Sequence, residues 1–156
     1  MFKVTLIAIL LAFNCMAVTV TDSMIRAIAM QESSCRNFVV GDLKNPNGKS
    51  YGMYQIRKGY LQDVMTHYGK ECKQKYGRLL TLEDMRTSPE KSKWVVIRYI
   101  SYYGSRYEKK TGKKMTAEIA FKLHNGGLQG YNPKYKKLYA CSTAYSKLVM
   151  RYYGKV

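Results

Sequence analysis

Acidic residues are scarce in this 156-residue chain: 10 Asp and Glu stand against 27 Lys and Arg, which leaves a formal net charge of +17. Proline is also rare, with three residues, and no repeat is visible, so a collagen-like or low-complexity chain is excluded. Hydrophobic residues make up 46% of the sequence, which is too many for a disordered polycation. A chain of this length forms one domain and buries roughly 68% of its unfolded surface, enough for a hydrophobic core.

Tyrosine, by contrast, is abundant, with 15 residues, and most of the positive charge comes from lysine. A cationic, tyrosine-rich surface favours an anionic polymer as partner: nucleic acid, an anionic membrane face or the acidic glycans of a bacterial wall. The basic residues are spread along the chain instead of forming one stripe, which argues against nucleic acid. The runs 109–110, 113–114 and 134–137 are expected to be solvated faces of a cationic shell that draws the protein to wall polymers.

The N-terminus has the pattern of a secretory signal peptide. A basic start at Lys3 is followed by an apolar run that Asn14 interrupts, too short for the ~18–20 residues that span a bilayer. The sequence predicts a signal over 1–17, cut after Ala17, and a mature domain over 18–156. A weak membrane anchor is the alternative. We expect an exported, monomeric protein, periplasmic or secreted, with no stable membrane insertion after cleavage.

Signal cleavage leaves three cysteines, Cys35, Cys72 and Cys141. Export favours disulfides, so we expect one bridge and one free thiol, with the pairing open. No Cys or His spacing is typical of a metal site, and His67 and His124 are far apart in the sequence. We therefore expect no metal and no cofactor.

Capping and stop signals predict five helices. They run from Thr21-Asp22-Ser23 to about Ser34, from Gly59 or Tyr60 to about Tyr76, from Ser88-Pro89 to about Lys110, from Ala117 to His124, and onward from Asn132-Pro133. The Gly-, Asn- and Pro-rich stretch 41–52 predicts a loop or a short irregular hairpin. Because the period-2 alternation of strands is nearly absent, the fold class is mainly α, in one compact domain.

Helical periodicity predicts which side chains are buried on the two longest helices. On the third helix the apolar face is Val96, Ile100, Tyr103 and Tyr107. On the last helix the buried side is expected to be Leu138, Cys141, Tyr145, Leu148, Val149 and Tyr152. Tyr99, Tyr102, Tyr103 and Tyr107 are expected to belong to core and rim, although some tyrosines should line a groove, where a ring face can stack on a sugar.

Glu32 is the informative anomaly of the first helix. Ile25, Ile28 and Ala29 form an apolar stripe, and Glu32 occupies the next position of that stripe. Burial and the C-terminal end of the helix dipole both favour the neutral acid. A carboxyl group that keeps its proton near neutral pH can protonate a leaving group. The alternative is a surface Glu, or one paired with an Arg such as Arg26 or Arg98.

Two glycine-containing corners accompany this carboxyl group. The segment Ser50-Tyr51-Gly52-Met53-Tyr54-Gln55-Ile56 lets the backbone approach a ligand closely, and His124-Asn125-Gly126-Gly127 forms a tight polar turn after a helix. Each alone is an ordinary loop corner or helix cap. With Gln31-Glu32-Ser33-Ser34 before them, they resemble the lysozyme-like superfamily, and the closest patterns are those of soluble lytic transglycosylases and invertebrate-type (destabilase) lysozymes.

The resemblance covers about 23–131 and implies a lysozyme-like fold that cleaves the β-1,4 bond between N-acetylmuramic acid and N-acetylglucosamine in peptidoglycan. It implies that Glu32 is the catalytic acid, and it assigns substrate-binding residues: Ser33, Ser50, Met53, Tyr54, Gln55, His124 and Asn125. His124 departs from the Tyr of transglycosylases and matches the His of invertebrate-type lysozymes. Leu128 departs from the Pro that often follows the glycines in these families.

The second carboxylate decides the reaction type. A hydrolase needs a second carboxylate about 5–9.5 Å from the catalytic acid, and lysozyme is the standard example of such a pair. Asp42 is the candidate for this second carboxylate. Asp42 is alternatively a turn former in Gly41-Asp42. If it points away, the resemblance implies a lytic transglycosylase, in which Glu32 also takes the proton of the muramoyl 6-hydroxyl and 1,6-anhydro ends form. We favour the transglycosylase slightly; a hydrolytic muramidase and a non-catalytic cationic wall-binding protein are the alternatives.

Overall fold

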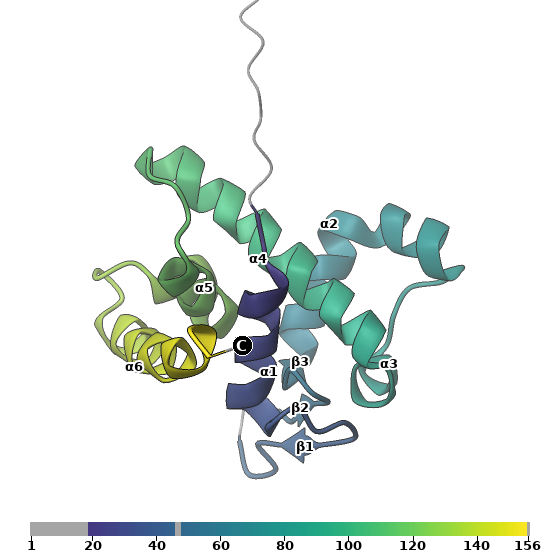
Figure 1. The fold of residues 1–156 in the computed structure, drawn as a ribbon. Helices are drawn as coiled ribbons and strands as arrows, with labels where there is room; N and C mark the ends of the chain where they lie inside the picture. Colours follow the sequence, from purple (N-terminus) through teal and green to yellow (C-terminus); the bar gives the residue numbers. More distant parts are fainter. Residues whose placement is uncertain (1–18, 46–47, 156) are drawn as a thin grey trace, which may run out of the picture.

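The computed structural model describes residues 19–45 and 48–155, so the predicted signal peptide and its cleavage site lie outside the described residues. The fold is mainly helical, as predicted. Its elements in chain order are α1 (Asp22–Ser33), β1 (Val40–Gly41), β2 (Ser50–Tyr51), β3 (Ile56–Arg57), α2 (Lys58–Tyr76), α3 (Leu82–Thr87), α4 (Pro89–Thr111), α5 (Ala117–Gly130) and α6 (Lys136–Tyr153). In Figure 1, α1 lies at the centre, α4 crosses behind it, and the strands lie below.

The helix ends follow the caps that the sequence predicted. The hydroxyls of Thr21, Ser88 and Thr116 each accept a hydrogen bond from a backbone N–H in the first turn of α1, α4 and α5. Gly77 and Gly112 end α2 and α4 in the left-handed conformation, which favours glycine. These local signals therefore determine where most of the helices begin and end.

The three short strands form one antiparallel sheet in the order β1-β2-β3. Val40 pairs with Tyr51 and Gly41 with Ser50, while Ser50 also pairs with Arg57 on the other side. The hairpin expected between 41 and 52 is therefore present, and a third strand extends it. Because the sheet follows α1 and precedes α2 directly, it holds the ends of these two helices near each other.

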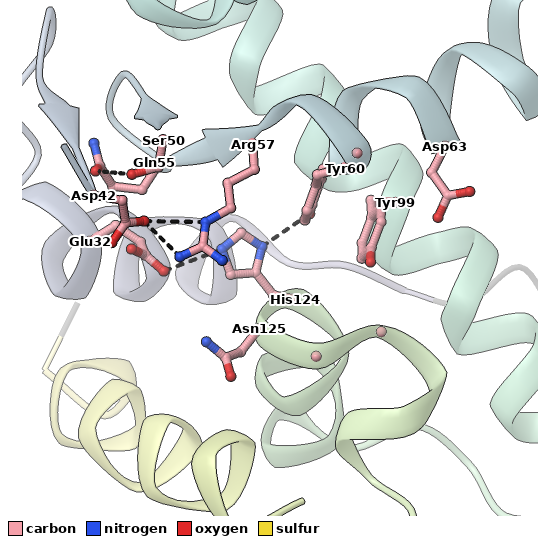
Figure 2. Close-up of a pocket in the computed structure, with 13 residues that line it drawn as sticks. Glu32, Asp42, Ser50, Gln55, Arg57, Tyr60, Asp63, Tyr99, His124 and Asn125 are labelled. Atoms are coloured by element: carbon pink, nitrogen blue, oxygen red, sulfur yellow. Dashed lines mark hydrogen bonds and ion pairs between the residues drawn. The ribbon is translucent and has the colours of Figure 1, made fainter. Parts of the chain in front are cut away.

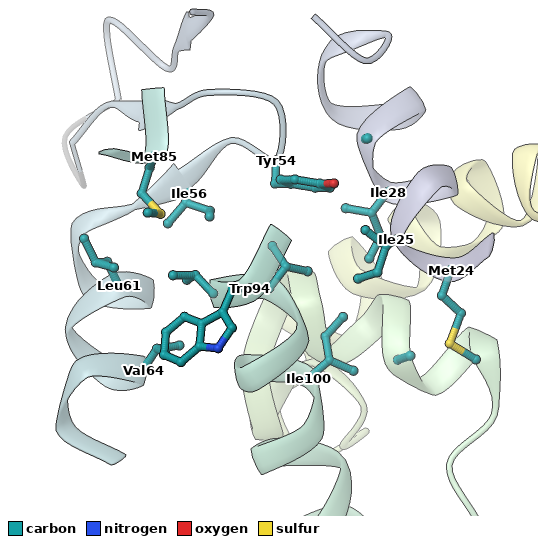
Figure 3. Close-up of a cluster of buried hydrophobic side chains, with 14 of the residues drawn as sticks. Met24, Ile25, Ile28, Tyr54, Ile56, Leu61, Val64, Met85, Trp94 and Ile100 are labelled. Atoms are coloured by element: carbon teal, nitrogen blue, oxygen red, sulfur yellow. The ribbon is translucent and has the colours of Figure 1, made fainter. Parts of the chain in front are cut away.

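The hydrophobic core lies between α1, the sheet, α2 and α4, with α5 and α6 completing it (Figure 3). Ile25 and Ile28 of α1 are almost completely buried, as are Val96 and Ile100 of α4, and Phe121 of α5 is completely buried. The apolar stripe predicted for α1 is thus a core face. No helix in the described part of the chain is long and apolar enough to cross a membrane.

The last two helices differ from the prediction. α5 extends to Gly130, but Gly127, with φ +55° and ψ −153°, kinks it into two helical segments. The glycine stop expected after His124 is therefore present as a kink, and a second short segment follows it. α6 begins at Lys136, after Asn132-Pro133, and buries Ser142, Ser146 and Val149, whereas Cys141 and Leu148 are exposed. The prediction of the buried side was therefore partly wrong, because a scale based on apolarity overlooks serine.

Small residues explain this α5–α6 interface. A Cβ atom on Gly126 would lie 2.4 Å from the Ser142 hydroxyl, and one on Gly130 would lie 2.7 Å from it. The two helices therefore approach more closely than larger side chains permit, and the polar Ser142 is buried because it is small and donates to Asn125 Oδ1 at 3.1 Å.

Two further expectations need correction. The sequence reasoning missed the short helix α3, whose capping box pairs Thr81 with Asp84. The expected disulfide is absent among the described cysteines, because all three are free and lie in different settings: Cys72 is buried in α2 and donates to the carbonyl of Arg78, Cys35 follows α1, and Cys141 is exposed on α6.

Asp84 ties α3 to its surroundings through a buried carboxylate. Its side chain is 7% exposed, and both its oxygens accept hydrogen bonds from the Arg78 guanidinium at 2.7 Å. Lys91 of α4 donates to it at 2.8 Å, and the backbone N–H of Thr81 does so at 2.8 Å. The hydrogen bonds from Arg78, followed by those from Lys91 and Thr81, outweigh burial and hold the pKa of Asp84 well below its usual range.

We expect Asp84→Asn to lower the free energy of unfolding by about 2 kcal/mol at neutral pH, since two cations and a backbone N–H lose a buried charged partner. Because the folded-state pKa is depressed, this contribution is present above the unfolded value near 3.9 and is lost as the pH falls below it, so wild type and variant should converge in acid. Denaturant unfolding across pH measures both effects. The control is Asp22→Asn, whose carboxylate pairs with Lys93 but is 89% exposed. Equal losses in the two variants would contradict the assignment.

Candidate active site

A cavity of about 440 Å³ opens where the end of α1, the sheet, the start of α2, α4 and the end of α5 meet (Figure 2). Its lining is rich in polar and aromatic side chains: Glu32, Asp42, Ser50, Gln55, Arg57, Gly59, Tyr60, Asp63, Tyr99, His124, Asn125, Gly126 and Gly127. The three sequence segments that carried the resemblance therefore contribute to one cavity, although they are separated by up to about ninety residues in the chain.

Glu32 lies in the last turn of α1 and reaches the cavity with its side chain 19% exposed. Its Oε1 lies 3.5 Å from His124 Nε2, and the His124 side chain is 4% exposed. The predicted half-buried carboxyl group is therefore present, and it is neither splayed into solvent nor paired with Arg26 or Arg98, the arginines considered as alternatives. Arg98 pairs with Glu71 instead.

His124 is held from its other side by Tyr60. The Tyr60 hydroxyl lies 3.0 Å from His124 Nδ1, and the Tyr60 ring stacks on Tyr99 with centroids 3.5 Å apart. Burial, with smaller contributions from Tyr99 and Glu32, raises the pKa of Tyr60 well above its ordinary value, so the phenol keeps its proton. Beside a Glu32 carboxylate, which only accepts, Nε2 must carry the ring proton; Nδ1 then accepts from Tyr60.

Tyr145 of α6 is the other phenol near Glu32. Its hydroxyl is buried, and no group among the described residues meets full hydrogen-bond geometry with it. Burial raises the pKa of Tyr145 well above its ordinary value, and the Glu32 carboxylate raises it further. A neutral phenol next to the carboxylate is a potential donor to it, so α6 contributes to the electrostatics of the site although it does not line the cavity.

The sheet corner is fixed by hydrogen bonds from Gln55. The Ser50 hydroxyl donates to Gln55 Oε1 at 2.6 Å, and Gln55 Nε2 donates to the Gly52 carbonyl at 2.8 Å. Glycine is required at two places: a Cβ atom on Gly41 would lie 2.0 Å from Gln55 Oε1, and one on Gly52, where φ is +72°, would lie 1.8 Å from the carbonyl oxygen of Met85. The glycines therefore allow this corner to close against the site.

Asp42 lines the cavity but is engaged by an ion pair. Its Oδ2 accepts from Arg57 Nη2 at 2.7 Å and from Arg57 Nε at 3.2 Å. The hydrogen bond from Arg57 is the main cause that lowers the pKa of Asp42, so this carboxylate stays ionised. Its φ of +56° and the hydrogen bond from the Asn45 N–H to its carbonyl also give it the role of turn former.

The structure brings together most, but not all, of the predicted site residues. Ser50, Gln55, His124 and Asn125 line the cavity with Glu32 and Asp42. The remaining three do not line it: Ser33, Met53 and Tyr54. Ser33 is buried and donates to the Met53 carbonyl at 2.9 Å, so it ties α1 to the sheet corner. Tyr54 is 5% exposed and belongs to the core, and the partly buried Met53 packs against it, so neither lines the cavity. That they contact sugar stays a prediction.

Sequence reasoning missed several residues at the site: Arg57, Tyr60, Asp63 and Tyr145. No spacing rule points to them, because each comes from a helix start or a helix face whose orientation depends on packing. Asp63 accepts a hydrogen bond from Tyr103 and lies beyond Tyr60 in Figure 2. Within residues 19–45 and 48–155, no group of three or more His, Cys, Asp or Glu could hold a metal ion.

We expect Tyr60→Phe to remove the hydrogen bond to His124 Nδ1 while the Glu32 contact keeps the ring proton on Nε2. Nitrogen-15 chemical shifts of the two ring nitrogens in mildly alkaline buffer measure this, and the signal of Nδ1 should lose the character of a hydrogen-bonded acceptor. His67, which stacks on Tyr102 away from this contact, is the internal control. Unchanged His124 shifts would show that Tyr60 does not donate to Nδ1.

Comparison with known proteins identifies no relative of this chain. No family model matches the chain, and no curated protein and no solved structure is significantly similar to it. Its function must therefore be argued from the geometry of the site.

Proposed function

We propose that this protein is a peptidoglycan-cleaving glycosidase of lysozyme-like type, which acts on the β-1,4 bond between N-acetylmuramic acid and N-acetylglucosamine. The observation that carries the proposal is the position of Glu32, a half-buried carboxyl group at the end of α1, in contact with His124 and at the wall of a polar, aromatic cavity. General acid catalysis needs such a group at a site that excludes most water.

The lining of the cavity suits a sugar polymer. Tyr60 and Tyr99 offer ring surfaces, and the exposed Asn125 offers amide N–H groups that can bond to sugar hydroxyls and acetamido groups. Ser50 and Gln55 bond to each other and shape the wall of the cavity. The net charge of +17 favours association with the anionic wall and makes that association sensitive to salt.

The reaction that we favour is lytic transglycosylation. In its protonated form Glu32 donates a proton to the glycosidic oxygen, so that the C–O bond to the leaving N-acetylglucosamine breaks. The resulting Glu32 carboxylate then takes the proton of the muramoyl 6-hydroxyl, whose oxygen bonds to C1 and closes the 1,6-anhydro ring. Glu32 ends protonated again, and no water enters the products.

His124 orients Glu32 during both steps. With Nδ1 accepting from Tyr60, Nε2 carries the ring proton and lies 3.5 Å from Oε1. A small approach of the two side chains would let Nε2–H donate to Oε1 and make this oxygen the carbonyl-like one. The proton of the acid then resides on Oε2, which is free to face the glycosidic oxygen. After the first transfer the same Nε2–H stabilises the new carboxylate charge.

The ion pair of Asp42 supports a mechanism with one carboxyl group. A carboxylate whose oxygen accepts two hydrogen bonds from Arg57 is a weakened nucleophile and a weakened base for water. The hydrolytic alternative rests on a different observation, namely that Asp42 lines the same cavity as Glu32. In that mechanism Asp42 would have to leave Arg57 or act through an oxygen that Arg57 does not bind.

We expect Glu32→Gln to clear a peptidoglycan suspension at least about 10²-fold more slowly than wild type, because the amide has no proton to donate at this position. Turbidity at several enzyme concentrations measures the rate. Glu90→Gln is the matched control, since Glu90 lies at the exposed start of α4. Equal clearing by wild type and Glu32→Gln would refute the enzyme; no clearing by either, with retained pelleting on walls, would identify a binding protein instead.

Product analysis of wild type and Asp42→Asn tests the reaction type. We expect 1,6-anhydro-muropeptides, each lighter by one water than the reducing product. We also expect Asp42→Asn to keep at least about a tenth of the wild-type rate, because the substitution weakens the contact with Arg57 but removes no group that the mechanism uses. Mass spectrometry distinguishes the two product types. Reducing ends from wild type, together with loss of cleavage in Asp42→Asn, would establish the muramidase in place of the transglycosylase.

A further inference from the structure

A second cavity, also of about 440 Å³, adjoins the first. The two share Tyr99, Gly126 and Gly127 in their linings, so they lie side by side along α4 and the end of α5. We call the two cavities together the trough. The second cavity is lined by three tyrosines of α4 and by Arg106, opposite residues 126–129. The roles proposed above for Glu32 and His124 do not involve this part of the trough.

Tyr102 holds Arg106 in place at this cavity. Arg106 Nη1 donates to the Tyr102 hydroxyl at 2.9 Å, and its guanidinium carbon lies 5.4 Å from the centroid of the Tyr102 ring. The Tyr102 ring in turn stacks on His67, with centroids 3.9 Å apart and planes inclined by 19°. An arginine held in this way loses less conformational freedom when it binds a ligand than a free one does.

Arg106 also lacks a carboxylate partner among the described residues. Four other arginines form ion pairs: Arg57, Arg78, Arg86 and Arg98. Asp63, which lines the first cavity, accepts a hydrogen bond from Tyr103 instead. Most of the guanidinium donors are therefore left to meet an anion that enters the second cavity, and the fork of an arginine matches a carboxylate.

We propose that Arg106 binds a carboxylate of the stem peptide carried by N-acetylmuramic acid, so that the protein prefers strands that still bear their peptides. This inference rests on the proposed function, because it assumes that a glycan strand occupies the first cavity. The peptide leaves each muramoyl residue through its lactyl ether and must run beside the strand. The tyrosine rings provide an apolar floor for that peptide, and Arg106 provides the cation at its edge.

The test compares cleavage of intact peptidoglycan with cleavage of glycan strands whose peptides an amidase has removed. We expect wild type to prefer the peptide-bearing strands by about two- to fivefold in kcat/KM, mainly through KM, as one exposed arginine–carboxylate pair permits. Arg106→Gln should lose this preference while cleaving the stripped strands at the wild-type rate. Arg106→Lys should keep only part of it, since a lysine has neither the fork nor the stacking on Tyr102. Lys109→Gln removes the same charge from an exposed position of α4 and is the matched control.

A binding experiment separates this inference from the proposed function. Calorimetry with the inactive Glu32→Gln chain measures affinity for a disaccharide-tripeptide and for the same disaccharide without peptide, each with and without Arg106→Gln. A preference for the peptide form that Arg106→Gln removes supports the contact, even if wild type cleaves neither substrate and the proposed enzyme is wrong. Equal affinities, or equal losses of cleavage on both strand types in Arg106→Gln, would overturn the contact while the glycosidase stands.

Discussion

The contact between Glu32 and His124 is the constraint on which the site depends. It joins the last turn of α1 to α5, and each partner is buried enough that the contact is shielded from water. A carboxyl group near the carbonyl end of its own helix gains nothing from the helix dipole, so other groups must orient and stabilise it. Those groups are the imidazole of His124, which Tyr60 holds, and the phenol of Tyr145.

The rest of the fold serves to bring these four side chains together. α1 carries Glu32, the first turn of α2 carries Tyr60, α5 carries His124, and α6 carries Tyr145. α5 and α6 approach each other closely through Gly126, Gly130 and Ser142, and this approach sets the distance between His124 and Tyr145. A larger residue at either glycine would separate the helices and displace His124 and Tyr145 relative to Glu32.

The positive charge of the protein acts in two ways, as a general field around the molecule and as single arginines at the walls of the trough. Most lysines are exposed and act as a diffuse field that screening by salt weakens. Arg57 and Arg106, in contrast, lie at cavity walls and are oriented by hydrogen bonds, one to Asp42 and one to Tyr102. The first keeps a carboxylate ionised and occupied, and the second is left free to meet an anionic ligand. Charge of the same sign thus has two different consequences, depending on which partner the fold places beside it.

The sequence by itself determined the helical class, the caps at Thr21, Ser88 and Thr116, and the unusual position of Glu32 on an apolar stripe, because these depend on residues close together in the chain. It also indicated which three segments would meet, and the cavity contains side chains from all of them. It could not place Tyr54 in the core or Ser142 in a helix interface, since both depend on how elements pack. Only the tertiary structure decided that Tyr60 holds His124 and that Arg57 engages Asp42, because these pairs join residues that no local rule of spacing connects.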